Sequence, residues 1–155
     1  WTTIKKENSK IKLHMIGKLQ TNKVKFVVNL FDYIHSVDSE KLAKKISDEA
    51  NKVDKKIKIF VQVNIGEEKQ KAGINKDYLN NLINFCKEIN LEVVGLMCIP
   101  PIDVNPLNYF KDMDALSKNY DFSELSMGMS SDYLEAAKNS ATYLRIGSSI
   151  FGNRS

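Results

Sequence analysis

Two short segments in the last quarter of the chain carry residue types that bind a phosphate group. Each is an apolar strand pattern that runs into a turn rich in Gly and Ser, the first within 125–133 and the second within 143–152. A phosphate needs backbone N–H groups that converge on it, and Gly lets the backbone come close. Ser hydroxyls add donors that rotate towards the phosphate oxygens. Because each turn follows a strand, the pair predicts one shared phosphate site.

A single arginine stands beside the second turn. Only two of the 23 basic residues are Arg, and one of them, Arg145, interrupts an apolar strand just before Gly147. A charge on an exposed strand face would explain it, but an Arg in an otherwise apolar run more often has a buried partner. We therefore favour a functional position for Arg145 over a surface one.

Composition narrows the class of protein. The chain has 155 residues, of which 43% are hydrophobic, enough for one globular domain with a core. No apolar run approaches the roughly 20 residues that span a membrane, and no signal-peptide pattern opens the chain. The net charge of +4 comes from lysines interspersed with acids, which is typical of solvated helices and not of a nucleic-acid site. Cys86 and Cys98 lack metal-site spacing, which favours a cytoplasmic protein without a metal.

The elements that position the two turns alternate along the whole chain. Apolar positions of period two predict strands, most clearly at Ile57, Ile59 and Val61. The predicted strands are 13–16, 33–37, 57–64, 92–97, 124–127 and 142–146.

Helical patterns lie between these strands. Asp38 or Ser39 can cap the first clear helix. Asn75 can cap a second, and Asp132 with Glu135 has capping-box spacing for a later one. The predicted buried face of the first helix consists of Leu42, Ile46, Ala50 and Val53.

Strand–helix alternation predicts a parallel sheet covered by helices. Both an open doubly wound sheet and part of a (β/α)8 barrel satisfy it. Polar residues such as Ser36, Gln62 and Ser148 gather where strands end, which favours the active-site face of a barrel. A barrel has eight strands and about 250 residues. Since the chain starts at Trp1 with the tail of a helix, we expect two strand–helix units upstream and residues 1–155 as one partial-barrel domain.

The chain resembles the YggS-like, or PROSC-type, pyridoxal-phosphate homeostasis proteins. Matching segments follow in the same order from one end of the chain to the other, which makes the resemblance specific. They are 14–23 (HMIGKLQTNK), 34–38 (IHSVD), 61–64 (VQVN), 95–97 (GLM), 125–132 (LSMGMSSD) and 145–152 (RIGSSIFG).

The resemblance implies a (β/α)8 TIM barrel of the alanine-racemase N-terminal-domain type, here lacking its first two strand–helix units. It implies that pyridoxal 5′-phosphate is the cofactor and that the role is intracellular vitamin B6 and amino-acid homeostasis without established turnover. The implied partners are the cofactor and pyridoxal-phosphate-dependent enzymes. The family's Schiff-base lysine lies on the first strand, upstream of Trp1, so we expect no catalytic residue in this chain.

The same resemblance assigns the binding residues. It implies that the cofactor phosphate is held by the two turns and that Arg145 reaches the cofactor. An arginine against the pyridine nitrogen would keep that nitrogen unprotonated, which suits a carrier better than a racemase or transaminase. The phosphate ligands implied are Ser126, Gly128, Ser130, Gly147 and Ser148.

Other interpretations stay open at the level of sequence. A barrel enzyme acting on a phosphorylated small molecule would use the same two turns, and a product without any ligand is a third class. His35, Asn64 and Met97 are further candidates for lining the pocket, although packing inside the barrel explains them more simply. His14 is interpreted as structural.

Overall fold

The computed structural model describes residues 1–102 and 104–152, and within them six parallel strands form one sheet. Each strand pairs in parallel with the next along the chain, so spatial order equals sequence order. The strands are β1 (His14–Met15), β2 (Tyr33–Val37), β3 (Lys58–Val63), β4 (Glu92–Cys98), β5 (Glu124–Met129) and β6 (Tyr143–Arg145). All six predicted strands are confirmed, with ends that differ by at most two residues.

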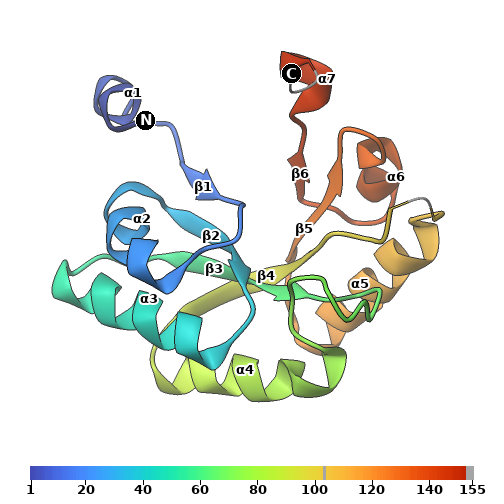
Figure 1. Cartoon of the computed structure of the whole chain (residues 1–155), viewed down its shortest axis with the longest axis horizontal. Coiled ribbons are helices and arrows are strands. Elements are labelled where there is room, and N and C mark those ends of the chain that lie inside the picture. Colours follow the sequence, from blue (N-terminus) through green and yellow to red (C-terminus); the bar gives the residue numbers. More distant parts are fainter. Residues whose placement is uncertain (103, 153–155) are drawn as a thin grey trace.

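Helices connect the strands and cover the outer side of the curved sheet, with β1 and β6 at its two ends (Figure 1). This is the arrangement of successive strand–helix units in a (β/α)8 barrel, which confirms the predicted fold class. The helices are α1 (Thr2–Glu7), α2 (Val24–Leu30), α3 (Glu40–Lys52), α4 (Lys76–Glu88), α5 (Leu107–Asn119), α6 (Tyr133–Lys138) and α7 (Ser148–Phe151), with a short 3-10 turn at Thr21–Lys23.

Helix α3 follows its prediction except at its end. Ser39 is the N-cap, and its Oγ accepts a hydrogen bond from the Leu42 N–H at 3.4 Å. The predicted face is buried through Ala50, but Val53 is 46% exposed. The helix ends at Lys52, and the non-helical backbone of Val53 turns it away from the core. Its assignment to the buried face was therefore wrong.

The capping box predicted for Asp132 is also wrong. The Asp132 side chain makes no cap hydrogen bond to α6. Its Oδ1 accepts from the Met129 N–H at 2.6 Å, and the Asp132 N–H donates back to the Met129 carbonyl at 3.0 Å. The carboxylate fixes the turn after β5 because the end of a strand offers it a donor as readily as the start of a helix does.

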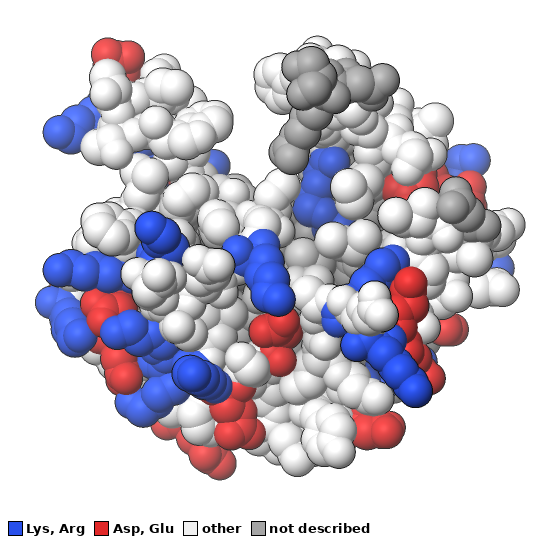
Figure 2. All heavy atoms as spheres, in the orientation of Figure 1, with Lys and Arg blue, Asp and Glu red and all other residues white. Residues whose placement is uncertain are grey.

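Charges on the surface are mixed in sign, and Figure 2 shows basic and acidic side chains side by side over much of the visible face. On α3, Glu49 bridges Lys45 at 2.7 Å and Lys52 at 2.8 Å. Such pairs are the solvated helix surface that the lysine pattern indicates. Within the described parts of the chain, no helix has the length and apolar character needed to cross a membrane.

Candidate functional site

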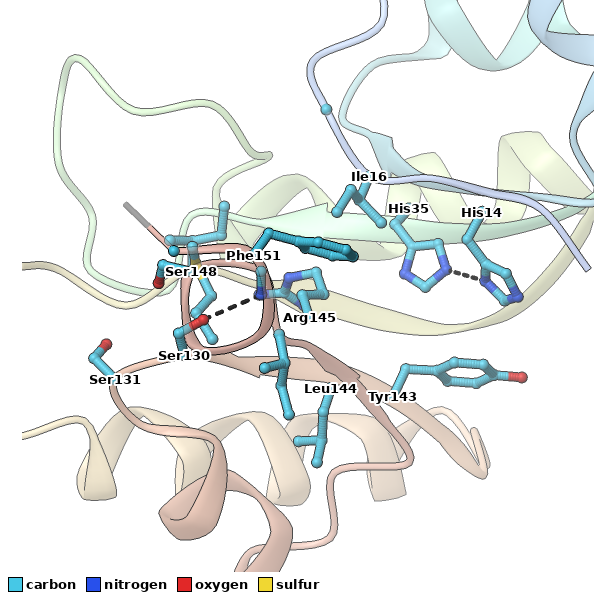
Figure 3. Close-up of a pocket in the computed structure, with 16 residues that line it drawn as sticks. His14, Ile16, His35, Ser130, Ser131, Tyr143, Leu144, Arg145, Ser148 and Phe151 are labelled. Carbon is cyan, nitrogen blue, oxygen red and sulfur yellow. Dashed lines mark hydrogen bonds between the residues drawn. The ribbon is translucent and has the colours of Figure 1, made fainter. Parts of the chain in front are cut away.

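An open cavity of about 1180 Å³ lies where the carboxyl ends of several strands meet. Its walls come from β1, β2 and β6 and from the turns that follow β5 and β6 (Figure 3). The residues that carry polar chemistry there are His14, His35, Ser130, Ser131, Tyr143, Arg145, Gly147 and Ser148. Parallel strands bring their carboxyl ends together, so residues distant in sequence share one cavity.

The two Gly/Ser turns meet at Ser130. Its Oγ accepts hydrogen bonds from the Gly147 N–H at 3.1 Å and the Ser149 N–H at 3.4 Å. Figure 3 shows Ser130 and Ser148 at the end of the cavity opposite His14. One oxygen atom from the first turn thus lies among backbone donors of the second. The two turns therefore lie together at one end of the cavity.

The two glycines of the turns differ in surroundings. Gly147 lines the cavity, and apart from its two chain neighbours a Cβ there would meet no atom of the described residues within 4 Å. Gly128 has φ +90°, and its Cβ would lie 2.5 Å from Ala136 Cβ in α6. Only glycine fits at position 128, because a side chain there would clash with α6, and Gly128 does not line the cavity. Packing does not demand Gly147, because the space where a side chain would lie is open.

Arg145 is held by two strands other than its own. Its Nη1 donates to Ser126 Oγ at 2.7 Å, and its Nη2 donates to the Cys98 carbonyl at 2.7 Å. Burial lowers the pKa of Arg145, while Cys98 and Asp132 act in the opposite direction. The group stays a cation, because the guanidinium cannot lose its proton in a protein. Arg145 is thus a fixed charge on the cavity wall and not a surface strand charge.

Ser126 lies behind this arginine. The residue is fully buried, and its Oγ is also 2.8 Å from His35 Nδ1. It is not among the residues that line the cavity. The structure thus separates Ser126 and Gly128, which lie behind the wall, from Ser130, Arg145, Gly147 and Ser148, which line it.

Two histidines continue from Ser126 along the cavity wall. His35 Nε2 lies 2.8 Å from His14 Nδ1 (Figure 3). His35 stacks on Phe60 with 4.2 Å between ring centroids, and His14 stacks on Tyr33 at the same distance. Burial, with smaller effects of His14 and Arg145, lowers the pKa of His35 to about 3. Burial also lowers the pKa of His14, so both imidazoles are neutral near pH 7.

Sequence reasoning had not placed His14 and Tyr143 at the cavity, yet both line it. Burial, with the neighbouring Tyr33, raises the pKa of the Tyr143 phenol to about 12, so this group stays a neutral donor. A signal was present in the sequence: His14 and His35 lie on consecutive strands that both lead to the carboxyl face. Asn64 bonds to the backbone of Glu68 and Met97 is buried, and neither lines the cavity.

The groups of this site are of kinds that can bind a ligand. Backbone donors and hydroxyls gather at one end, a fixed cation lies in the middle, and neutral imidazoles line the other end. Apolar side chains of Ile16 and Ile99 complete the walls. This arrangement suits a small phosphorylated molecule with an apolar body and a hydrogen-bond acceptor.

Comparisons with known proteins agree on one family. The alanine racemase N-terminal domain matches residues 3–155. The pyridoxal phosphate homeostasis protein of Aquifex aeolicus is 39% identical over 91% of this chain and 66% of its own length. That of Synechocystis is 35% identical over 93% of this chain and 71% of its own. The chain therefore spans about two thirds of the length of these relatives.

Solved structures give the same result. The structure of PipY from Synechococcus elongatus with PLP bound has a TM-score of 0.88 and 29% identity, covering 97% of this chain and 75% of that one. Agreement in fold and in sequence extends over nearly the whole described chain. The chain belongs to the family of the pyridoxal phosphate homeostasis proteins, built on the alanine racemase N-terminal domain.

Proposed function

We propose that the cavity binds pyridoxal 5′-phosphate, with the phosphate between the turns after β5 and β6. The observation that carries this proposal is the convergence of the Gly147 and Ser149 N–H groups on Ser130 Oγ, beside open space at Gly147. Ser130, Gly147 and Ser148 would hold the phosphate. The names of the relatives and the PLP-bound PipY structure support the cofactor over other phosphorylated molecules.

Arg145 would meet the ring of the cofactor. Its two nitrogens Nη1 and Nη2 are held by Ser126 and Cys98, so the group cannot follow a moving ligand. When bound, pyridoxal phosphate supplies a reactive aldehyde and an electron-withdrawing ring. A permanent donor against the pyridine nitrogen leaves that nitrogen unprotonated, and the ring then withdraws electrons poorly. We therefore propose a carrier that holds the cofactor and does not turn substrates over.

The role follows from the binding. We propose that the protein buffers pyridoxal phosphate in the cytoplasm and passes it to pyridoxal-phosphate-dependent enzymes, so that it contributes to vitamin B6 and amino-acid homeostasis. An open cavity supports exchange of the ligand with solvent and with a recipient. The names of the relatives support the homeostatic role.

Titration with matched ligands tests the binding proposal. The cofactor should bind about 100-fold more tightly than pyridoxal, because the phosphate adds charge-assisted hydrogen bonds that the alcohol lacks. Inorganic phosphate should compete with the cofactor. Absorbance and fluorescence of the cofactor report both. Equal affinity for pyridoxal would contradict the phosphate site, and stronger competition by a sugar phosphate than by the cofactor would favour a barrel enzyme instead.

A further inference from the structure

A chain of four polar side chains runs through the interior of the sheet beside the cavity. It begins at Arg145 in β6, passes through Ser126 in β5 and His35 in β2, and ends at His14 in β1. The three links measure 2.7, 2.8 and 2.8 Å. Four residues from four strands are thus connected without a gap.

The direction of these hydrogen bonds follows from counting protons. Arginine only donates, so Ser126 Oγ accepts from Arg145 Nη1. The single hydroxyl proton of Ser126 then goes to its other partner among the described residues, His35 Nδ1. His35 Nδ1 is therefore the acceptor, and the proton of this neutral imidazole sits on Nε2. That Nε2–H donates to His14 Nδ1, which places the proton of His14 on its own Nε2.

The opposite direction would leave a buried group without a partner. If His35 carried its proton on Nδ1, both Arg145 and His35 would donate to Ser126 Oγ. The hydroxyl proton of this fully buried serine would then have no acceptor among the described residues. A buried donor without a partner keeps the full cost of its lost hydration, which selects the first arrangement.

We infer that Ser126 and His35 are positioning residues, which hold Arg145 against the cavity through a one-way hydrogen-bond chain that ends at His14. The inference rests on the proposed function in one respect, that Arg145 meets the cofactor. Two of the five guanidinium N–H groups donate to Ser126 and Cys98, and the other three have no hydrogen-bond partner among the described residues. Ser126 therefore acts on the cofactor through Arg145 and is not a phosphate ligand.

Aromatic side chains limit the movement of the two histidines in this hydrogen-bond chain. Phe60 stacks on His35, and Tyr33 stacks on His14. The low pKa of His35 agrees with a ring that stays neutral beside the arginine. A binding group fixed in this way loses little side-chain entropy when the ligand arrives.

Nitrogen NMR of histidine tests the direction of the chain without any cofactor. In the wild-type protein at pH 7, both His14 and His35 should carry their proton on Nε2. Ser126→Ala removes the donor to His35 Nδ1, and the tautomer of His35 should no longer be fixed. Ser117→Ala is the matched control. Ser117 is also buried, and its hydroxyl donates to the Phe122 carbonyl, which takes no part in the hydrogen-bond chain from Arg145 to His14. A proton on Nδ1 of wild-type His35 would overturn the inference, even if Ser126→Ala failed to fold.

Cofactor affinity tests whether Ser126 acts through Arg145. Ser126→Ala should weaken binding of pyridoxal phosphate about tenfold, the effect of losing one charge-assisted hydrogen bond. Ser117→Ala should not weaken it. In an Arg145→Met background, Ser126→Ala should have no further effect, because the residue it supports is gone. Equal effects in both backgrounds would overturn the positioning role. If the wild type bound no cofactor, the proposed function would fail, whereas the histidine tautomers would still decide the inference.

Discussion

Replacing Gly147 by Leu should weaken binding of pyridoxal phosphate about 100-fold while leaving the fold intact. The side chain would occupy the open space at Gly147 on the cavity wall, where we propose the phosphate to lie. The variant should lose most of the binding free energy that the phosphate contributes, because that energy comes from charge-assisted hydrogen bonds to the turns. Titration of the variant with the cofactor measures this effect. Far-UV circular dichroism should be unchanged, since among the described residues no atom beyond the two chain neighbours lies within 4 Å of the added Cβ.

Two further variants show whether the loss of affinity comes from position 147 or from added side-chain volume in general. Gly147→Ala adds one methyl group at the same position and should have a smaller effect than Leu. Ala137 is an exposed residue of α6 that does not line the cavity. Ala137→Leu adds comparable side-chain volume there and should leave the affinity for the cofactor unchanged. Wild-type affinity in Gly147→Leu would contradict the phosphate site between the two turns.

The strand order was predictable because local pattern and tertiary structure agree along most of the chain. Ile57, Ile59 and Val61 alternate as β3 requires, and their buried side chains pack in the core. Consecutive strands joined by helices are neighbours in a sheet more often than not, and in a (β/α)8 barrel they always are. The choice of a barrel depended on polar strand ends, yet of Ser36, Gln62 and Ser148 only Ser148 lines the cavity, and the other two are buried.

Element ends were less predictable because several local hydrogen bonds compete there. Asp132 could cap α6 or accept from Met129, and both use the same carboxylate. The sequence contains no information on which donor the folded chain brings nearer. Val53 belongs to the same class, since its exposure depends on where α3 stops.

The sequence assigns the phosphate site to two turns but does not reveal which of their residues line the cavity. Ser126 and Ser130 belong to the same Gly/Ser segment, and the sequence assigns both to phosphate binding. In the structure, β5 continues to Met129, so Ser126 is a mid-strand residue and Ser130 lies in the turn. The register between β5 and β6 is irregular between Ser126 and Met129. Such an irregularity changes which face a residue occupies, and periodicity alone does not reveal it.

The histidines show a related limit. Each lies in a short strand of mostly apolar residues, where packing explains it adequately when the sequence is considered alone. Their significance arises from the link between His14 and His35 and from the contact of His35 with Ser126, 91 residues away. Contacts between residues so far apart in sequence form only when several strands lie close together.

The close approach of β4 to β5, which carry the two hydrogen-bond acceptors of Arg145, depends on Gly95. Gly95→Ala should destabilise the fold by about 3 kcal/mol, at the upper end of the usual cost of overpacking. Gly95 pairs with Glu124 across the two strands, and a Cβ there would lie 1.9 Å from the Glu124 carbonyl oxygen. Backbone atoms cannot yield as a flexible side chain would, so β4 and β5 must separate. Urea unfolding should give a lower midpoint for this variant than for the wild type.

Gly17→Ala provides the control for this prediction, because its Cβ would make only an ordinary contact, 3.8 Å from Met15 Cε. That variant should unfold near the wild-type midpoint. Separation of β4 from β5 would also move the two acceptors of Arg145, since the Cys98 carbonyl lies on β4 and Ser126 on β5. Gly95→Ala should therefore bind the cofactor more weakly even where it remains folded. An unchanged midpoint would mean that the two strands can adjust to a methyl group, and that close approach at Gly95 does not hold Arg145 in place.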